Sequence, residues 1–570
     1  MRKKLITLVG LLGVSACSTP VPVRDAGVDA FTSMVDTGES SPDAVTPVDT
    51  GTPVDAPGLD APRECTMAGE CAPAENATAR CESNHCVYDC IDGFDDCDGA
   101  LGCEQAIDVA SHCGSCTNDC GATGYCEGGS CGTGVTVSWV RTITGLGPDQ
   151  RGQALAARGE EVFSVGYVDG AGAVTFDGMT SMGLRGAYDS WIVSAPSDGT
   201  SGTLRSIAGA QEDVARAVLP LESGLVVVGA IRDYTTSPFP GGPAPGGGRD
   251  GFVARYGYDA STSTPSAVDV WAGASLDEVM GAVEARDGSF YVCGVFSAGA
   301  RFGGGTAYSP AHGVDHEFVV VHYTASVTRD WATTIHATDA QYCQIALQGE
   351  RVRLALTFGG DLEPVGMTPL HAEGLDFALL ELNGVDGAVL GARQYGGSGR
   401  DVVTFLAANA AGELVASGST NASLDVGGGA FTGTSEDAFA FGLHPDDAFA
   451  WQLIVRGEDA EQPTGLAMDG HGNSYLAFRS ASAAFDAGAE HFSRAGSDWF
   501  GAVLSVDRDG RLRWTRLVPP TSVFAHPAQL AVAPSGLVFV QGQFAGTGRI
   551  EGELVDSMGG QDAFLMALDP

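Results

Sequence analysis

The sequence predicts an all-β chain: a seven-bladed β-propeller of four-stranded blades over residues 135–570, preceded by a small disulfide-rich module and a disordered linker. Three observations predict it. The chain is rich in glycine, with 81 in 570 residues, and poor in charged residues at 18%, which is typical of short strands joined by tight turns. Twelve cysteines gather in one short segment, and one phrase recurs about every sixty residues.

The recurring phrase is a short apolar run that opens on an acidic residue followed closely by an aromatic one. Its seven copies are separated by 59 to 66 residues and place their aromatic side chains at Trp191, Phe252, Phe318, Phe377, Phe439, Phe500 and Phe564. Internal repetition at such a period is the mark of a repeat architecture. We expect each copy to be one strand of one blade.

Three further units follow the same period. One is an outer strand, as at Trp139 and Trp514, and one is a strand after a turn that ends at a glycine, as at Gly229 and Gly542. The third is rich in small residues, as near Ala154 and Ala217, which suits the crowded innermost strand of a radial array. Four strands in each of seven repeats predict a seven-bladed propeller. The strand at Trp139 would complete the last blade; a β-helix or a pair of sandwiches is the structural alternative.

Some of these phrases resemble a known family. GGSGRD at 396–401, DAFAFGL from Asp437 and DGHGNSYLAF at 469–478 are similar to the bacterial seven-bladed β-propeller repeat family (SBBP). The resemblance extends over nearly all of residues 135–570 and is patchiest in the fourth repeat.

The first sixteen residues have the features of an export signal. Arg2, Lys3 and Lys4 precede an apolar run over 5–14 that is too short to span a bilayer. The run ends in Val14-Ser15-Ala16-Cys17, which resembles the lipobox of bacterial lipoproteins. That resemblance implies cleavage before Cys17 and lipid attachment to its thiol, and Ser18 after it implies the outer membrane. An ordinary secretory peptide is the alternative.

Residues 17–63 predict a disordered tether. Pro, Asp and Thr recur there without strand or helix periodicity, and Phe31 is the only aromatic residue. Such a segment cannot bury enough apolar surface to offset its conformational entropy. We expect an extended spacer.

Residues 64–132 predict a disulfide module. It holds twelve of the fifteen cysteines, an even number that favours six disulfides in an oxidising compartment: Cys65, Cys71, Cys81, Cys86, Cys90, Cys97, Cys103, Cys113, Cys116, Cys120, Cys126 and Cys131. The stretch resembles a module of myxobacterial surface lipoproteins, which implies no activity.

Two metal sites are alternatives within this module. Zinc could be bound by Cys113 and Cys116 with His112 or His85. Calcium could be bound by the acidic run at Asp92, Asp95, Asp96 and Asp98, although the alternation of an EF-hand loop is absent. A disulfide framework and a solvated acidic loop are the preferred interpretations, so no cofactor is predicted.

The formal net charge is −41. A surface this acidic repels phosphate backbones, so nucleic acid is not expected as a partner. Solubility is the simplest explanation of the charge.

No catalytic motif is evident in the repeats. The acidic residue before each aromatic one is interpreted as a turn residue that binds local backbone N–H groups. His312, His316 and Glu317 are assigned to a surface loop. Cys293 and Cys343 form either a disulfide between neighbouring blades or two buried free thiols, and the sequence does not distinguish these alternatives.

These features predict an exported outer-membrane lipoprotein, on the cell surface or facing the periplasm, held to the membrane through Cys17. Its expected function is binding, adhesion or scaffolding through the propeller loops, without catalysis, toward a protein or glycan ligand. Loops 233–250 and 308–317 depart most from the repeat. The alternative is a carbohydrate-active enzyme, a glycan hydrolase or lyase with its site at the central channel.

Overall fold

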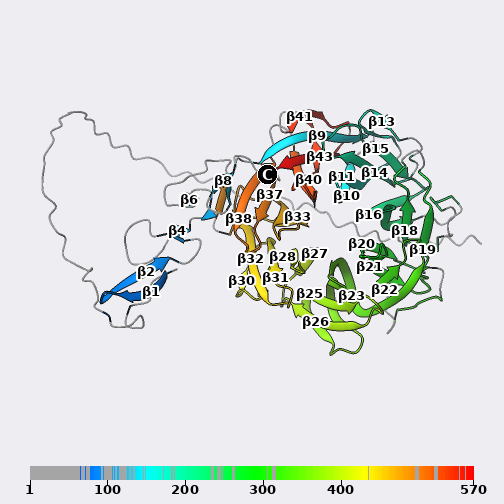
Figure 1. The fold of residues 1–570 in the computed structure, drawn as a ribbon. Helices are drawn as coiled ribbons and strands as arrows, with labels where there is room; N and C mark the ends of the chain where they lie inside the picture. Colours follow the sequence, from blue (N-terminus) through cyan, green and yellow to red (C-terminus); the bar gives the residue numbers. More distant parts are fainter. Residues whose placement is uncertain are drawn as a thin grey trace, which may run out of the picture. The chain divides into compact units, whose positions relative to one another are not determined.

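The computed structural model describes Cys65, Cys71, residues 77–90, short strands between 94 and 132 and, apart from brief gaps, residues 135–570. Every regular element in these residues is a β-strand (Figure 1). None of the described segments is a helix of the length and apolar character needed to cross a membrane. The predicted leader, the tether and lipid attachment at Cys17 lie outside the described residues.

The N-terminal module contains short antiparallel hairpins. Its strands are β1 (Ala77–Glu82), β2 (His85–Cys90), β3 (Phe94–Asp95), β4 (Gln105–Ala106), β5 (Asp108–Val109), β6 (His112–Cys113), β7 (Tyr125–Glu127) and β8 (Ser130–Gly132). They pair in order, β1 with β2 through β7 with β8.

Residues 136–569 contain seven four-stranded antiparallel units, which we number sheets 1 to 7 in chain order. Sheet 1 is β10 (Gln150–Arg158), β11 (Glu161–Asp169), β14 (Tyr188–Pro196) and β15 (Thr203–Ile207). Sheet 2 is β16 (Glu212–Leu221), β17 (Gly224–Arg232), β18 (Asp250–Tyr256) and β19 (Ala267–Trp271). Sheet 3 is β20 (Glu278–Glu284), β21 (Phe290–Ser297), β22 (His316–Tyr323) and the first part of β23 (Arg329–Gln348).

The remaining sheets follow the same order. Sheet 4 is the second part of β23, β24 (Arg351–Glu363), β25 (Leu370–Asn383) and β26 (Val389–Tyr395). Sheet 5 is β27 (Asp401–Ala408), β28 (Leu414–Thr420), β31 (Asp437–Leu443) and β32 (Phe449–Gly457). Sheet 6 is β33 (Glu461–Met468), β34 (Ser474–Ser480), β37 (Phe500–Val506) and β38 (Leu512–Val518). Sheet 7 is β39 (Phe524–Val532), β40 (Val538–Ala545), β43 (Asp562–Asp569) and β9 (Thr136–Gly145).

Short hairpins leave this frame between the second and third strands of four sheets. They are β12 (Val174–Phe176) with β13 (Met179–Thr180), β29 (Ser423–Leu424) with β30 (Phe431–Thr432), β35 (Ala484–Ala487) with β36 (Glu490–Ser493), and β41 (Thr547–Ile550) with β42 (Glu553–Asp556). Two of them extend the outer strand of the preceding sheet: Phe176 lies opposite Ile143 of β9, and Phe485 lies opposite Gly457 of β32.

The repeat phrases fall at equivalent places in these sheets. The recurring aromatic residues all lie in third strands, from Trp191 in β14 to Phe564 in β43. The glycine that ends the second-strand phrase lies directly opposite the aromatic ring in several sheets, as Gly542 does opposite Phe564. A Cβ on Gly542 would lie 2.1 Å from that ring, so the glycine is required for the ring to lie against the backbone.

Hydrophobic packing runs from each sheet to the next. One core joins sheets 1 and 2 through Val165 and Phe252, and equivalent cores join every following pair. A seventh core packs Phe539 of sheet 7 against Trp191 of sheet 1. First strands of neighbouring sheets contact one another, and β39 contacts β10. The all-β chain therefore has a propeller-like order of sheets that closes on itself.

The N-terminal strand completes sheet 7, as the sequence predicts. β9 pairs antiparallel with β43, with Thr142 opposite Phe564, and Figure 1 shows the two strands side by side. Strand β43 would otherwise be an exposed edge.

A disulfide joins sheets 3 and 4. Cys293 of β21 is bonded to Cys343 of β23, with Cα atoms 6.1 Å apart and both side chains fully buried. The sequence left a disulfide and two free thiols as alternatives, and the structure contains the disulfide.

Candidate functional site

Each innermost strand carries a β-bulge near its start, after two to four paired residues. The residues left out of the ladder are Gln153, Arg216, Met280, Gln341, Thr404, Thr464 and Ala528. A bulge on an edge strand turns one side chain out of the alternation of the sheet, and such bulges are common beside functional sites. We call these seven residues the bulge layer.

Arg216 is the charged member of the bulge layer. Its guanidinium donates to the Gln153 side chain of sheet 1 at 2.7 Å and pairs with Glu278 of sheet 3 at 2.5 Å. The Arg216 side chain is 32% exposed, whereas that of Glu278 is 8% exposed. One side chain therefore links three sheets while part of its charged surface stays open to solvent.

The residues two positions before the bulge, with their partners on the second strand, provide a second layer. In sheet 1, Arg151 lies opposite Tyr167; in sheet 6, the equivalent pair is Gln462 and Arg479. Sheet 7 lies between these two sheets and contributes His526 at the same level. Side chains more than 300 residues apart in the chain are thus brought to one end of the inner strands.

The charges in this layer act on one another. Burial lowers the pKa of Arg479, and the Arg151 guanidinium lowers it further while Glu436 opposes both. Burial also lowers the pKa of His526 to about 4, with Arg479 and Arg151 acting in the same direction. His526 is therefore neutral at neutral pH, and the positive charge in this layer comes from the arginines.

Two tyrosines stand beside these arginines. The rings of Tyr167 and Tyr188 meet edge to face with centroids 5.2 Å apart, and both side chains are half-buried. Burial raises the pKa of Tyr167, whereas Arg151 and Arg216 lower it. We call Arg151, Arg216 and Arg479, together with Tyr167, Tyr188 and His526, the arginine arc.

Acidic and amide partners fix the orientation of Arg151 and Arg479. Arg151 pairs with Asp149 at 2.9 Å, and Arg479 donates to the Gln462 side-chain oxygen at 2.6 Å. Gln462 in turn donates to Glu436 at 2.8 Å. Side chains held by such networks keep one geometry, which favours recognition of a partner over free movement in solvent.

The acidic residue that opens each third strand has the structural role expected for it. Asp250 Oδ2 accepts the backbone N–H of Gly246 at 2.8 Å, and Asp562 Oδ2 accepts that of Met558 at 2.8 Å. Both side chains are buried. The turn interpretation is therefore confirmed at these positions.

The opposite ends of the inner strands have a different character. A depression of about 370 Å³ is lined by small and apolar side chains of sheets 3 to 5, among them Leu347 and Ala408, together with Glu284 and Arg286. Arg158 of sheet 1 pairs with Glu284 of sheet 3 at 2.7 Å. The single carboxylate of Glu284 in this lining therefore already has a partner.

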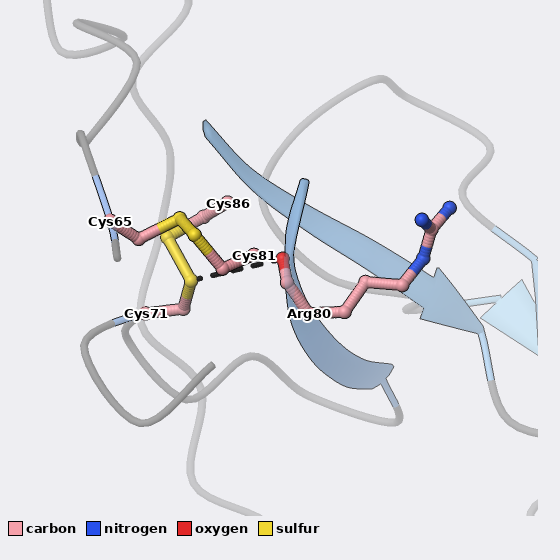
Figure 2. Close-up of a disulfide and its surroundings, with 5 residues drawn as sticks. All are labelled: Cys65, Cys71, Arg80, Cys81 and Cys86. Carbon is pink, nitrogen blue, oxygen red and sulfur yellow. Dashed lines mark hydrogen bonds between the residues drawn. A yellow bond between two sulfur atoms is a disulfide. The ribbon is translucent and has the colours of Figure 1, made fainter. Parts of the chain in front are cut away.

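Two predicted disulfides of the N-terminal module are present. Cys65 is bonded to Cys81, and Cys71 to Cys86. Figure 2 shows both bonds on one side of the β1–β2 hairpin, with the Arg80 side chain directed away from them. Three of these sulfur atoms lie within 4.8 Å of one another, but bonded sulfurs are not thiolate ligands, so the cluster is a disulfide pair and not a metal centre.

The other predicted disulfide cysteines and the candidate metal ligands lie mostly outside the described residues. Cys90 is also disulfide-bonded. The side chains of Cys97, Cys103, Cys113, Cys116, Cys120, Cys126 and Cys131, and those of the candidate calcium ligands, lie outside the described residues. The disulfides that are described are typical of a protein that folds in an extracellular or periplasmic compartment.

The histidines singled out in the third repeat do not form a metal site in the described residues. His316 Nε2 lies 3.1 Å from the Ala340 carbonyl oxygen, and Glu317 pairs with His336 at 2.6 Å. His316 and Glu317 belong to strand β22. Their assignment to a surface loop is therefore wrong. His312, and parts of the loops 233–250 and 308–317, lie outside the described residues.

The arginine arc was missed by sequence reasoning. Its members share no motif, because they come from four sheets and meet only through the closure of sheet 7 on sheet 1. One signal was present: arginine replaces a small or uncharged residue at the bulge position of a single repeat, in ARAVL around Arg216.

Comparisons with known proteins show only that the fold of this chain is similar to some solved structures. Neither a family model nor a curated protein matches the sequence. Among solved structures, polysaccharide lyase Uly1 is 9% identical with a TM-score of 0.41, covering 74% of this chain and 90% of the other. A PL25 ulvan lyase bound to -[GlcA(1-4)Rha3S]- is 10% identical with a TM-score of 0.39, covering 70% and 92%.

A subtype N10 neuraminidase-like protein of A/little yellow-shouldered bat/Guatemala/060/2010 is 9% identical with a TM-score of 0.31, covering 76% of this chain and all of the other. The structural neighbours thus include polysaccharide lyases and other propeller proteins. Likeness of this size transfers neither activity nor substrate to this chain.

Proposed function

We propose that the chain is a ligand-binding lipoprotein of the cell envelope, anchored through Cys17, whose sheets 1 to 7 are the blades of a single seven-bladed β-propeller. In this proposal the recognition site is the arginine arc at one end of the inner strands. The arc is the observation that carries the proposal. Binding, adhesion and scaffolding are the corresponding roles for a protein held outside the cytosol.

The arginine arc contains unfavourable electrostatic interactions that a purely structural role does not explain. The Arg151 guanidinium lowers the pKa of Arg479, and both arginines lower the pKa of His526, so groups of like charge are held near each other. Positive groups are also scarce in a chain of net charge −41. Unfavourable arrangements of this kind are typical of functional sites.

Binding is tested with the purified mature chain against a panel of glycans and envelope proteins. We expect saturable binding of at least one member, and weaker binding by Arg216→Ala because the guanidinium that links three sheets is lost. Arg158→Ala, at the other end of β10, is the matched control. Absence of any saturable ligand would support a purely structural envelope role.

Anchoring is tested on whole cells. Metabolic labelling with a lipid precursor should mark the wild-type chain and not Cys17→Ser. Digestion by external protease would place the propeller on the cell surface, whereas protection would place it in the periplasm.

The tyrosine pair favours one second candidate, a carbohydrate-active enzyme. Tyr167 and Tyr188 stand beside Arg151 and Arg216, and these two guanidinium groups lower the pKa of Tyr167 against the effect of burial, which is the direction that proton transfer near neutral pH requires. Glycans that bind should therefore also be assayed for new chain ends. Turnover that is lost in Tyr188→Phe while binding persists would establish catalysis; binding without turnover would exclude it for that glycan.

A further inference from the structure

The chemistry of the arginine arc defines what kind of ligand it takes. Resting on the proposed binding function, we propose that the arc binds an anionic saccharide, recognised through carboxylate or sulfate groups on its sugar rings. The argument depends on three features: the distribution of charge, the arrangement of the arginines and the nearby aromatic rings.

Positive groups gather at this end of the inner strands against the charge of the whole chain. Beside Arg151, Arg216 and Arg479, Arg249 directly precedes β18 and lies 3.3 Å from Glu278 and 3.5 Å from Glu212. Glu278 is therefore shared between Arg216 and Arg249. Glu212 also pairs with Arg232 at 3.2 Å, so three guanidinium groups share two carboxylates, which leaves positive charge that an incoming anion can neutralise.

Arg151 and Arg479 provide the second feature. They come from sheets 1 and 6, which flank sheet 7, and each acts electrostatically on His526 between them. Because His526 is neutral, these two guanidinium groups repel one another across sheet 7 without an intervening counter-charge from that side chain. Asp149 pairs with Arg151 at 2.9 Å and Glu436 attracts Arg479, so an anion placed between the two guanidinium groups would add to these counter-charges, which favours negative ligands over neutral ones.

The third feature selects saccharides among anions. Tyr167 and Tyr188 form a partly exposed aromatic surface next to Arg151 and Arg216, and Tyr342 is 42% exposed on the inner strand of sheet 4. Aromatic rings with a polar tip pack against the C–H faces of sugar rings while their hydroxyl groups remain available for hydrogen bonds. An inorganic anion alone would make no use of these rings.

The arrangement also excludes a polyanion bound by charge alone. Each arginine is held by a hydrogen-bonded neighbour, Gln153 for Arg216 and Gln462 for Arg479. Fixed donors recognise a group of defined geometry such as a carboxylate or a sulfate ester. We therefore expect dependence on particular arginines and not on the number of positive charges.

The test measures binding of the mature chain to three oligosaccharides of similar length: a polygalacturonate, a sulfated galactan and a neutral galactan. We expect at least one of the two anionic probes to bind with an affinity that falls as salt rises. The neutral probe should bind at least about tenfold more weakly. Preference for the carboxylated or the sulfated probe identifies which anionic group is recognised.

Variants locate the binding. Arg151→Gln and Arg479→Gln should each weaken binding of the anionic probe by roughly tenfold or more, because each removes a charged hydrogen-bond donor. Arg158→Gln lies on the same strand as Arg151 but at its other end, and should bind as the wild type does. Competition on the wild-type chain tests the anionic preference without any change to the fold. Monomeric galacturonate should displace the anionic probe more effectively than galactose does.

The outcomes separate this inference from the proposed function. Equal binding of neutral and anionic probes, or unchanged binding in both arc variants, would overturn the anionic-saccharide inference while leaving a binding protein. Failure of every probe, together with failure of the wider panel to bind, would overturn both. Binding that Arg158→Gln weakens as strongly as the arc variants would move the site away from the arc.

Discussion

Buried carboxyl groups at the boundaries between sheets are the residues whose environment differs most from water. Asp250 at the start of β18 and Asp277 just before β20 belong to neighbouring sheets, and both side chains are at most 1% exposed. Burial raises the pKa of Asp250 to about 7, and the Asp277 charge adds to this effect. Burial raises the pKa of Asp277 itself to about 6, although Ser297 and Gly273 donate hydrogen bonds to it.

These raised pKa values make the stability of the fold depend on pH. A carboxyl group whose pKa is higher in the folded chain favours folding when it is protonated. Its contribution is complete below about pH 4 and is lost as the pH rises through about 7. We expect the free energy of unfolding to fall between pH 5 and pH 8 because of Asp250, with Glu461 contributing in the same direction.

Asp250→Asn should flatten this dependence and stabilise the chain at pH 8 by about 1–2 kcal/mol. The asparagine oxygen can still accept the N–H of Gly246. Urea unfolding at pH 5 to 8 measures the effect, with the exposed Asp509→Asn as control. Equal slopes for wild type and Asp250→Asn would contradict the assigned burial effect.

At the scale of elements, the disulfide between β21 and β23 fixes sheet 3 to sheet 4. It closes a loop of 50 residues, and it lies within the hydrophobic core shared by the two sheets. β23 also runs from one sheet into the other without a break. This boundary therefore has two covalent connections where the other boundaries have one.

Removing the bond should weaken this boundary. Cys293→Ala together with Cys343→Ala should lower the free energy of unfolding by about 2–4 kcal/mol, because the unfolded chain loses a constraint on a long loop. Thermal unfolding under non-reducing conditions measures the loss. The single variants are controls, and their free thiol should react with an alkylating agent only after unfolding. Two reactive thiols on these peptides in the unreduced wild-type chain would contradict the bond.

Sequence patterns were sufficient for the strands and insufficient for the arc. The period of the aromatic residues predicts the third strands, since an aromatic residue recurs at the same place in each of them, and in sheets 1, 2, 5 and 7 it lies opposite a glycine. A bulge shifts one strand by a single residue and leaves no fixed residue type, so Gln153 and Arg216 carry no recognisable pattern. The proximity of Arg479 to Arg151 depends on closure through sheet 7, which no local sequence feature encodes.

At the scale of the whole molecule, stability depends on β9. Its Ile143 is fully buried between sheet 7 and sheet 1, and Trp139 Nε1 donates to the Ser197 carbonyl at 2.7 Å. The strand therefore covers the edge of β43 and contributes side chains to the core that joins the last sheet to the first.

Two truncations test this dependence. A chain that begins at residue 135 retains β9 and should keep the oligomeric state of the mature chain, whereas one that begins at 147 exposes the β43 edge and should aggregate or unfold at lower denaturant. Size-exclusion chromatography and denaturant midpoints compare them. Ile143→Ala provides a milder change, with an expected loss of about 2–4 kcal/mol. Equal midpoints for the two truncations would show that closure by β9 contributes little.

Pairing of β9 with β43 also sets the order in which the domain can form. A ribosome or an export channel delivers β9 first and β43 last, and 417 residues separate Gly145 from its partner Asp562. Six sheets can assemble as the chain emerges, but the seventh must wait for its end. During that interval the apolar faces of β9 and sheet 1 lack their partners, so the nascent chain needs protection from aggregation until the final strand arrives.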